Sequence, residues 1–126
     1  MRLVLDSGAL IALERNDRSM WIRFKTAHAS GIVVVTHGGV VGQAWRGKGP
    51  RQALLARALA GTDVRPLDDA LGRAAGELLA HGRSRDVIDA ALVLLARDGD
   101  RIITSDFDDL EPLMTAADLD VEVVRP

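Results

Sequence analysis

Three aspartates stand at the expected starts of helices, and two of them directly follow apolar runs. Residues 3–5 lead into Asp6, residues 102–105 lead into Asp106, and Asp86 precedes a third helical segment. In an open α/β sheet the carboxyl ends of the strands line the ligand-binding crevice, so these side chains could meet there. Converging carboxylates repel one another, and a hard cation such as Mg²⁺ or Mn²⁺ relieves the repulsion. We therefore expect a metal site at this edge.

Each aspartate also has a purely structural interpretation. Aspartate is a favoured N-cap residue because its carboxylate accepts hydrogen bonds from the free amides of the first helical turn. Asp6 and Asp106 could simply cap the helices that follow them, and Asp86 could be a first-turn acid behind a Ser84 cap. Capping does not explain why two of these acids follow predicted strands. A capping carboxylate can also bind a metal, so the two interpretations are compatible.

Helical spacing adds further polar candidates to the site. Asp89 lies three residues after Asp86, and Asp109 lies three residues after Asp106, so each pair shares one helix face. We predict Asp109 as an additional metal ligand, because it belongs to an acidic segment that would overhang the strand ends. Asp89 is an auxiliary candidate whose alternative is a solvated or arginine-paired surface residue. Ser7, next to Asp6, could hydrogen-bond the metal shell or a phosphate.

The elements that must position these acids alternate between strands and helices. The predicted strands are residues 2–5, 32–35, 63–67, 101–104 and 121–124, and the predicted helices are residues 7–15, 19–29, 38–45, 51–60, 69–80 and 85–97. A further helix is expected after Asp106. This alternation predicts a three-layer α/β/α sandwich with a central parallel sheet of about five strands.

Composition limits the class of protein. The 126 residues suit a single domain, residues 1–126. With 16 basic and 18 acidic residues the net charge is −2, so no global basic field indicates nucleic-acid binding, although a local patch can exist. The absence of cysteine excludes disulfides and thiolate metal sites and suits the cytoplasm. No apolar stretch is long enough to span a membrane, so we expect a cytoplasmic protein without a membrane partner.

Three basic residues could hold a phosphate backbone. Arg46, Lys48 and Arg51 surround a glycine-rich break, although a basic turn is often only solvated. Arg83 and Arg85, which flank the Asp86 helix start, are competing candidates, and Arg85 could instead balance the acids. Among the histidines only His37, just after the second predicted strand, lies near this edge and could touch a substrate.

The motifs resemble the PIN domain and, within it, the toxin ribonucleases of VapBC toxin–antitoxin systems. The resemblance rests on three segments in order, LVLDSGALIAL at 3–13, DVIDAAL at 86–92 and ITSDFDDL at 103–110. It implies a PIN-like fold and an Mg²⁺- or Mn²⁺-dependent endoribonuclease that hydrolyses RNA phosphodiester bonds, with Asp6, Asp86 and Asp106 at the family's acidic positions. It also implies a homodimer that is held inactive by an antitoxin.

One position departs from the family pattern. PIN toxins place a glutamate on the helix after the second strand, and the matching residue here is Gln43. Glutamine carries no charge and cannot take a proton, although its carbonyl oxygen can still accept a hydrogen bond or bind a metal weakly. Asp89 or Asp109 could supply the missing charge, or the metal site could be weaker. A third alternative is an inactive PIN-like module that only binds RNA or a partner.

Overall fold

A five-stranded, all-parallel sheet forms the centre of the computed structural model, which describes residues 1–126. Its strands are β1 (Leu3–Leu5), β2 (Val34–His37), β3 (Asp63–Arg65), β4 (Arg101–Ile103) and β5 (Glu122–Val124). They lie in the order β3-β2-β1-β4-β5, so β1 occupies the middle with β2 and β4 on either side. The predicted α/β class with about five parallel strands is confirmed.

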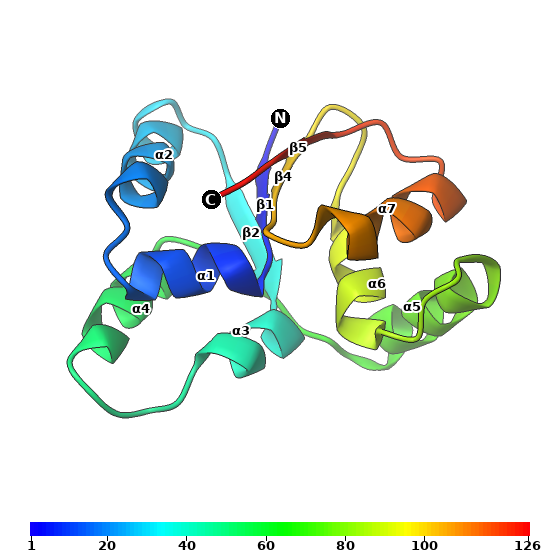
Figure 1. Ribbon diagram of the computed structural model, residues 1–126, viewed down its shortest axis with the longest axis horizontal. Coiled ribbons are helices and arrows are strands. Elements are labelled where there is room, and N and C mark those ends of the chain that lie inside the picture. The colour runs from blue at the N-terminus through cyan, green and yellow to red at the C-terminus, as the bar shows by residue number, and fades with distance from the viewer.

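Seven helices cover the two faces of the sheet. They are α1 (Ser7–Glu14), α2 (Arg18–Ala29), α3 (Gly38–Ala44), α4 (Arg51–Ala60), α5 (Asp69–His81), α6 (Val87–Leu95) and α7 (Phe107–Ala116). Figure 1 shows α1 to α4 on one side of the strands and α5 to α7 on the other. The predicted three-layer α/β/α sandwich is therefore confirmed.

An aliphatic core holds these layers together. It contains 28 buried hydrophobic residues in one continuous cluster, and every residue of β1 and β2 is buried. Burial on both faces explains the unbroken apolar sequence of β1. The edge strand β3, by contrast, is exposed along its length. None of the helices combines the length and the apolar composition that crossing a bilayer requires.

Two predicted boundaries need correction. The second strand was predicted at residues 32–35, but β2 spans Val34–His37. Its last two residues are polar, yet each finds a partner inside the protein: the Thr36 hydroxyl donates to the Leu5 carbonyl at 2.7 Å, and the His37 ring is hydrogen-bonded as described below. The helix predicted at residues 85–97 is shorter, because α6 begins at Val87, directly after Asp86.

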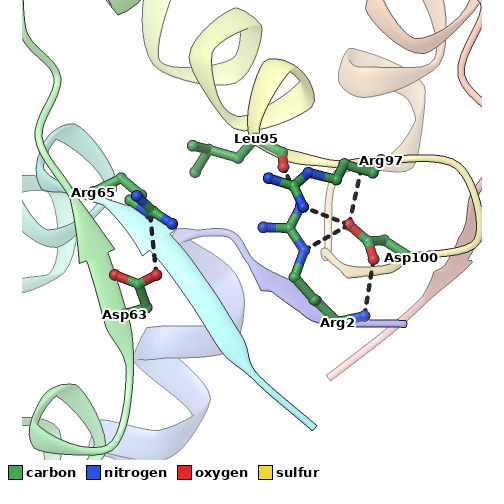
Figure 2. A network of polar contacts seen from close by, with 6 residues as sticks. All are labelled: Arg2, Asp63, Arg65, Leu95, Arg97 and Asp100. Atoms are coloured by element: carbon green, nitrogen blue, oxygen red, sulfur yellow. Dashed lines mark hydrogen bonds and ion pairs between the residues drawn. The ribbon is translucent and has the colours of Figure 1, made fainter.

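A buried ion pair joins β1 and β4 at the amino end of the sheet, opposite the predicted site. Figure 2 shows the Asp100 carboxylate between the Arg2 side chain and the backbone of Arg97. The Arg2 guanidinium lies 2.9 Å from Asp100, and the backbone N–H groups of Arg2 and Arg97 donate to the same carboxylate at 2.8 and 2.9 Å. Burial by itself would raise the pKa of Asp100, but these hydrogen bonds and the Arg2 charge lower the pKa below its ordinary value.

Replacement of Asp100 by alanine should therefore destabilise the protein by about 3–5 kcal/mol, because Arg2 would lose its partner in a mostly buried position. Urea unfolding at neutral pH measures the change. Asp63→Ala is the matched control, because Asp63 pairs with Arg65 at the surface, where the two side chains are 43% and 53% exposed. The control should lose about 1 kcal/mol or less. Equal losses in the two variants would show that burial of the Arg2–Asp100 pair has no special weight.

Candidate functional site

Asp6 lies at the carboxyl end of β1 and begins α1. It is only 6% exposed, and its Oδ1 accepts a hydrogen bond from the Ala9 N–H at 3.0 Å. Burial raises the pKa of Asp6, and the nearby Asp106 carboxylate raises it further, whereas the hydrogen bonds from Thr104 and from the backbone lower it. Asp6 is therefore both an N-cap and a buried carboxylate within the electric field of Asp106.

The segments that follow β1 and β4 contact each other around the Asp6 carboxylate. The Thr104 hydroxyl donates to Oδ2 of Asp6 and accepts from the Asp106 N–H at 2.9 Å. Gly8 allows this close approach, because a Cβ at this position would lie 2.3 Å from the Ser105 hydroxyl oxygen and would displace that side chain. The first and last acidic motifs are thus bound directly to each other by side-chain contacts.

Capping explains two of the three aspartates but not the third. Asp86 caps α6 through Oδ1, which accepts from the N–H groups of Ile88 and Asp89 at 2.9 and 3.1 Å. Ser84 was considered as the cap of this helix, but its hydroxyl instead accepts from the Asp86 N–H. Asp106 precedes α7 and makes no side-chain cap hydrogen bond. Capping therefore does not account for the carboxylate of Asp106.

Asp89 is the acidic residue whose pKa is raised by four other acids of the site. Its pKa is raised to about 6, first by burial and then by the carboxylates of Asp86, Asp109, Asp6 and Asp106, in that order. The other four acids that the sequence singled out are therefore each within electrostatic reach of Asp89. Asp89 forms no ion pair with an arginine, contrary to the paired alternative, and it is only half-exposed.

A cleft of about 730 Å³ opens over this part of the site. Four carboxylates line it, those of Asp86, Asp89, Asp108 and Asp109. Its remaining lining residues are Arg83, Ser84, Arg85, Val87, Ile88 and Pro112. Asp108 was not among the predicted ligands, because it does not share the helix face of Asp106 and Asp109. The cleft thus joins the start of α6 to the first turn of α7.

The donor set fits a hard divalent cation. No three acidic or histidine side chains are close enough, as they stand, to hold one ion together. Magnesium does not require such a cage, because it usually keeps several waters and binds through one or two carboxylates and substrate phosphates. The raised pKa of Asp89 shows that negative charge here is under-compensated. Oxygen donors with an unbalanced negative charge favour Mg²⁺ or Mn²⁺.

His37 is a structural residue of this site. The ring is fully buried, so it presents no surface for the substrate contact that the sequence left possible. Its Nδ1 accepts from the Gly39 N–H at 3.1 Å, so Nε2 carries the proton and donates to the Ile88 carbonyl at 2.9 Å. Burial lowers the pKa of His37, which keeps the ring neutral. Because Asp86 binds the N–H of Asp89, the Ile88–Asp89 peptide group is held at both ends.

The three basic residues predicted to bind phosphate lie outside the cleft. The Arg46 guanidinium donates to the carbonyls of Gly42, Gln43 and Trp45, so it caps the end of α3. Neither Arg46 nor Lys48 nor Arg51 lines the cleft. A buried glutamine missed by sequence reasoning, Gln52, holds the turn by accepting from the N–H groups of Arg46 and Gly47, both at 2.9 Å. No sequence motif marks it.

Two predicted auxiliary residues occupy neighbouring helices without forming contacts of their own. Gln43 is half-buried on α3, and Ser7 is half-buried in the first turn of α1. Neither side chain makes a hydrogen bond within the protein, and neither lines the cleft. Their roles remain predictions.

Comparison with known proteins identifies the fold. No protein-family model matches the sequence, and no curated protein matches it either. A chain in the crystal structure of VapBC2 from Rickettsia felis, bound to a DNA fragment from their promoter, superimposes with a TM-score of 0.70. The alignment covers 98% of this chain and 99% of that chain, at 13% sequence identity. The chain therefore shares its fold with a protein of the VapBC class, whereas identity this low leaves the activity to be argued from the site.

The contribution of Asp89 to the stability of the metal-free protein should become more favourable as the pH falls from about 7 towards about 5. The folded-state pKa of Asp89, about 6, lies above its ordinary value of 3.8, so the folded protein binds this proton before the unfolded chain does. Asp89→Asn should accordingly raise the melting temperature near neutral pH by a few degrees, and its advantage over the wild-type protein should shrink as the pH falls towards about 5. Thermal denaturation in a chelator measures both effects. A lower melting temperature for Asp89→Asn at neutral pH would contradict the repulsion.

His37→Ala should weaken Mn²⁺ binding about tenfold, as loss of an outer-sphere partner does, because the Ile88–Asp89 peptide group would lose one of its two anchors. Isothermal titration with Mn²⁺ measures the affinity, and thermal denaturation reports stability separately. His37→Gln, which retains a donor, should recover part of the affinity. If His37→Ala lowers the melting temperature but leaves the Mn²⁺ affinity unchanged, His37 serves packing alone.

Proposed function

We propose that the chain is an Mg²⁺- or Mn²⁺-dependent endoribonuclease that hydrolyses RNA phosphodiester bonds, and that it is the toxin of a toxin–antitoxin pair. One observation carries the proposal: a half-buried aspartate, Asp89, lies within the field of four other carboxylates at the carboxyl edge of a parallel sheet. The sequence motifs and the fold shared with VapBC2 support the same conclusion. An acidic cluster of this kind is suited to binding a cation that in turn receives a phosphate.

Each acid contributes through its own position. Asp86, Asp89 and Asp109 line the cleft and would hold the metal, with the buried Asp6 and the uncapped Asp106 completing the negative field. The bound ion would lower the pKa of an attacking water and neutralise charge on the reacting phosphate. Asp89 supplies the charge that Gln43 lacks. The cap hydrogen bonds fix Asp6 and Asp86 before any ligand arrives.

The partners follow from the same proposal. The substrate is RNA, and an antitoxin is the expected protein partner, as the VapBC2 assembly of the structural neighbour suggests. A homodimer and a cytoplasmic location also belong to this proposal. A small DNA-binding protein encoded directly upstream would support it.

The competing function is an inactive PIN-like module that binds RNA or a partner without cleaving. Two observations favour it: Gln43 is uncharged, and no three acidic side chains are arranged to hold one ion. The two functions differ in a single measurable property, namely metal-dependent cleavage.

Incubation of the protein with structured RNA should give cleavage in Mn²⁺ and none in a chelator. Asp86→Asn should reduce the rate by about a hundredfold or more, since loss of even an outer-sphere partner of a metal typically costs about 10–100-fold. Asp68→Asn is the matched control, because Asp68 caps α5 through the Leu71 N–H in the same way and does not line the cleft. Because asparagine also caps helices, both variants should fold. Unchanged cleavage by Asp86→Asn would rule out the proposed mechanism.

A further inference from the structure

The cleft beside the acids also carries two positively charged residues. Arg83 and Arg85 line it together with Asp86, Asp89 and Asp109. We propose that these two arginines bind backbone phosphates of a single-stranded RNA next to the acidic site. This inference rests on the proposed function and deepens it, because it assigns the residues that hold the substrate.

Neither arginine is neutralised by the protein. The ion pairs of the structure involve Arg2, Arg65, Arg73 and Arg101. Arg83 and Arg85 are exposed, donate no side-chain hydrogen bond and form no ion pair, although five carboxylates gather nearby. None of the influences on the pKa of Asp89 comes from an arginine. Arg85 therefore forms no ion pair with the acid cluster, and both guanidinium groups are available to a ligand.

The separation of charge within the cleft suits a phosphodiester. Carboxylates alone would repel a polyanion, and this repulsion would act most strongly before a cation binds. A guanidinium group presents donors in a fork that matches phosphate oxygens. Because the acids and two unpaired arginines line the same cleft, a nucleic acid could place one phosphate near the acids and others against the arginines.

The arginine segment is held in place relative to the acids. Ser84 lies between the two arginines, and its hydroxyl accepts from the Asp86 N–H at 3.2 Å. Asp86 in turn caps α6. This short chain of hydrogen bonds connects the segment that carries Arg83 and Arg85 to the first turn of the helix that bears Asp89. The positive and negative groups therefore belong to one local structure.

The other basic candidates are placed less favourably. Arg46 uses its guanidinium on three backbone carbonyls of α3 and its end. Lys48 and Arg51 are exposed but lie outside the cleft that the acids line. Because both also lack an ion pair, they provide a control with the same loss of charge.

The test is the salt dependence of RNA binding. Fluorescence anisotropy of a fluorescein-labelled single-stranded polyuridylate, in chelator so that no cleavage occurs, gives Kd across a range of salt concentrations. Each phosphate contact to a single strand contributes about 0.7 to the slope of log K against log salt, so Arg83→Ala/Arg85→Ala should reduce the slope by about 1.4. Lys48→Ala/Arg51→Ala, which removes the same charge, should leave the slope unchanged.

The possible outcomes separate this inference from the proposed function. An unchanged slope for the Arg83/Arg85 variant overturns the inference even if the wild-type protein cleaves RNA in Mn²⁺. Equal slope reductions in both double variants also overturn it, because the effect would then be one of net charge. A wild-type protein that binds RNA through these arginines but cleaves none in Mn²⁺ refutes only the nuclease. Absence of any RNA binding by the wild-type protein refutes the inference, whatever the cleavage assay shows.

Discussion

The parallel pairing of β1 with β4 determines where the first and last acidic motifs meet. Leu5 lies opposite Ile103, so Asp6 and Thr104 leave the sheet side by side at its carboxyl edge. The Thr104 hydroxyl then links the Asp6 carboxylate to the backbone of Asp106. A slip of one residue between these buried strands would turn their side chains to the opposite faces. The register that packs the core is therefore the register that assembles the acids, and neither can change alone.

Placing several carboxylates close together costs free energy through charge repulsion. Contacts beside the acids and an ion pair at the other end of the same strands offset this cost. Locally, backbone N–H groups donate to Asp6 and Asp86, and the hydrogen bonds that Asp6 receives from the backbone and from the Thr104 hydroxyl favour its charged form. At the amino end of the same two strands, the Arg2–Asp100 pair holds β1 against β4. Asp100 receives enough hydrogen bonds to lower its pKa, whereas burial and four other carboxylates raise that of Asp89. The pKa values of Asp100 and Asp89 thus shift in opposite directions. Asp100 has a cationic partner and N–H donors, whereas Asp89 has mainly carboxylate neighbours.

The sequence predicted as metal ligands the acids that strand topology places, but it gave Asp89, whose position depends on helix rotation, only as an auxiliary candidate. Asp6 follows a strand, and the edge to which it points is a consequence of parallel topology alone. Asp89 lies on a helix in which Ala90 to Val93 are all buried, so the apolar pattern does not reveal which face meets the cleft. Side chains that bind nearby backbone carbonyls leave no recognisable sequence pattern either. Arg46, whose guanidinium donates to the Trp45 carbonyl, is an example. The polar end of β2, with His37, reads as a loop because its partners lie far away in sequence.

The central place of Asp89 also gives a physical reason for an uncharged residue at position 43. The helix that carries Gln43 packs against α6, which carries Asp89. The pKa of Asp89 is already raised to about 6 by burial and four carboxylates. A glutamate on the neighbouring helix would raise it further, towards a value at which Asp89 is protonated at neutral pH and offers a cation no charge. Glutamine avoids that addition, so in the proposed metal site the negative charge is carried by Asp89 on α6. The uncharged side chain of Gln43 and the carboxylate of Asp89 are then complementary, because the first avoids adding to the repulsion on the second.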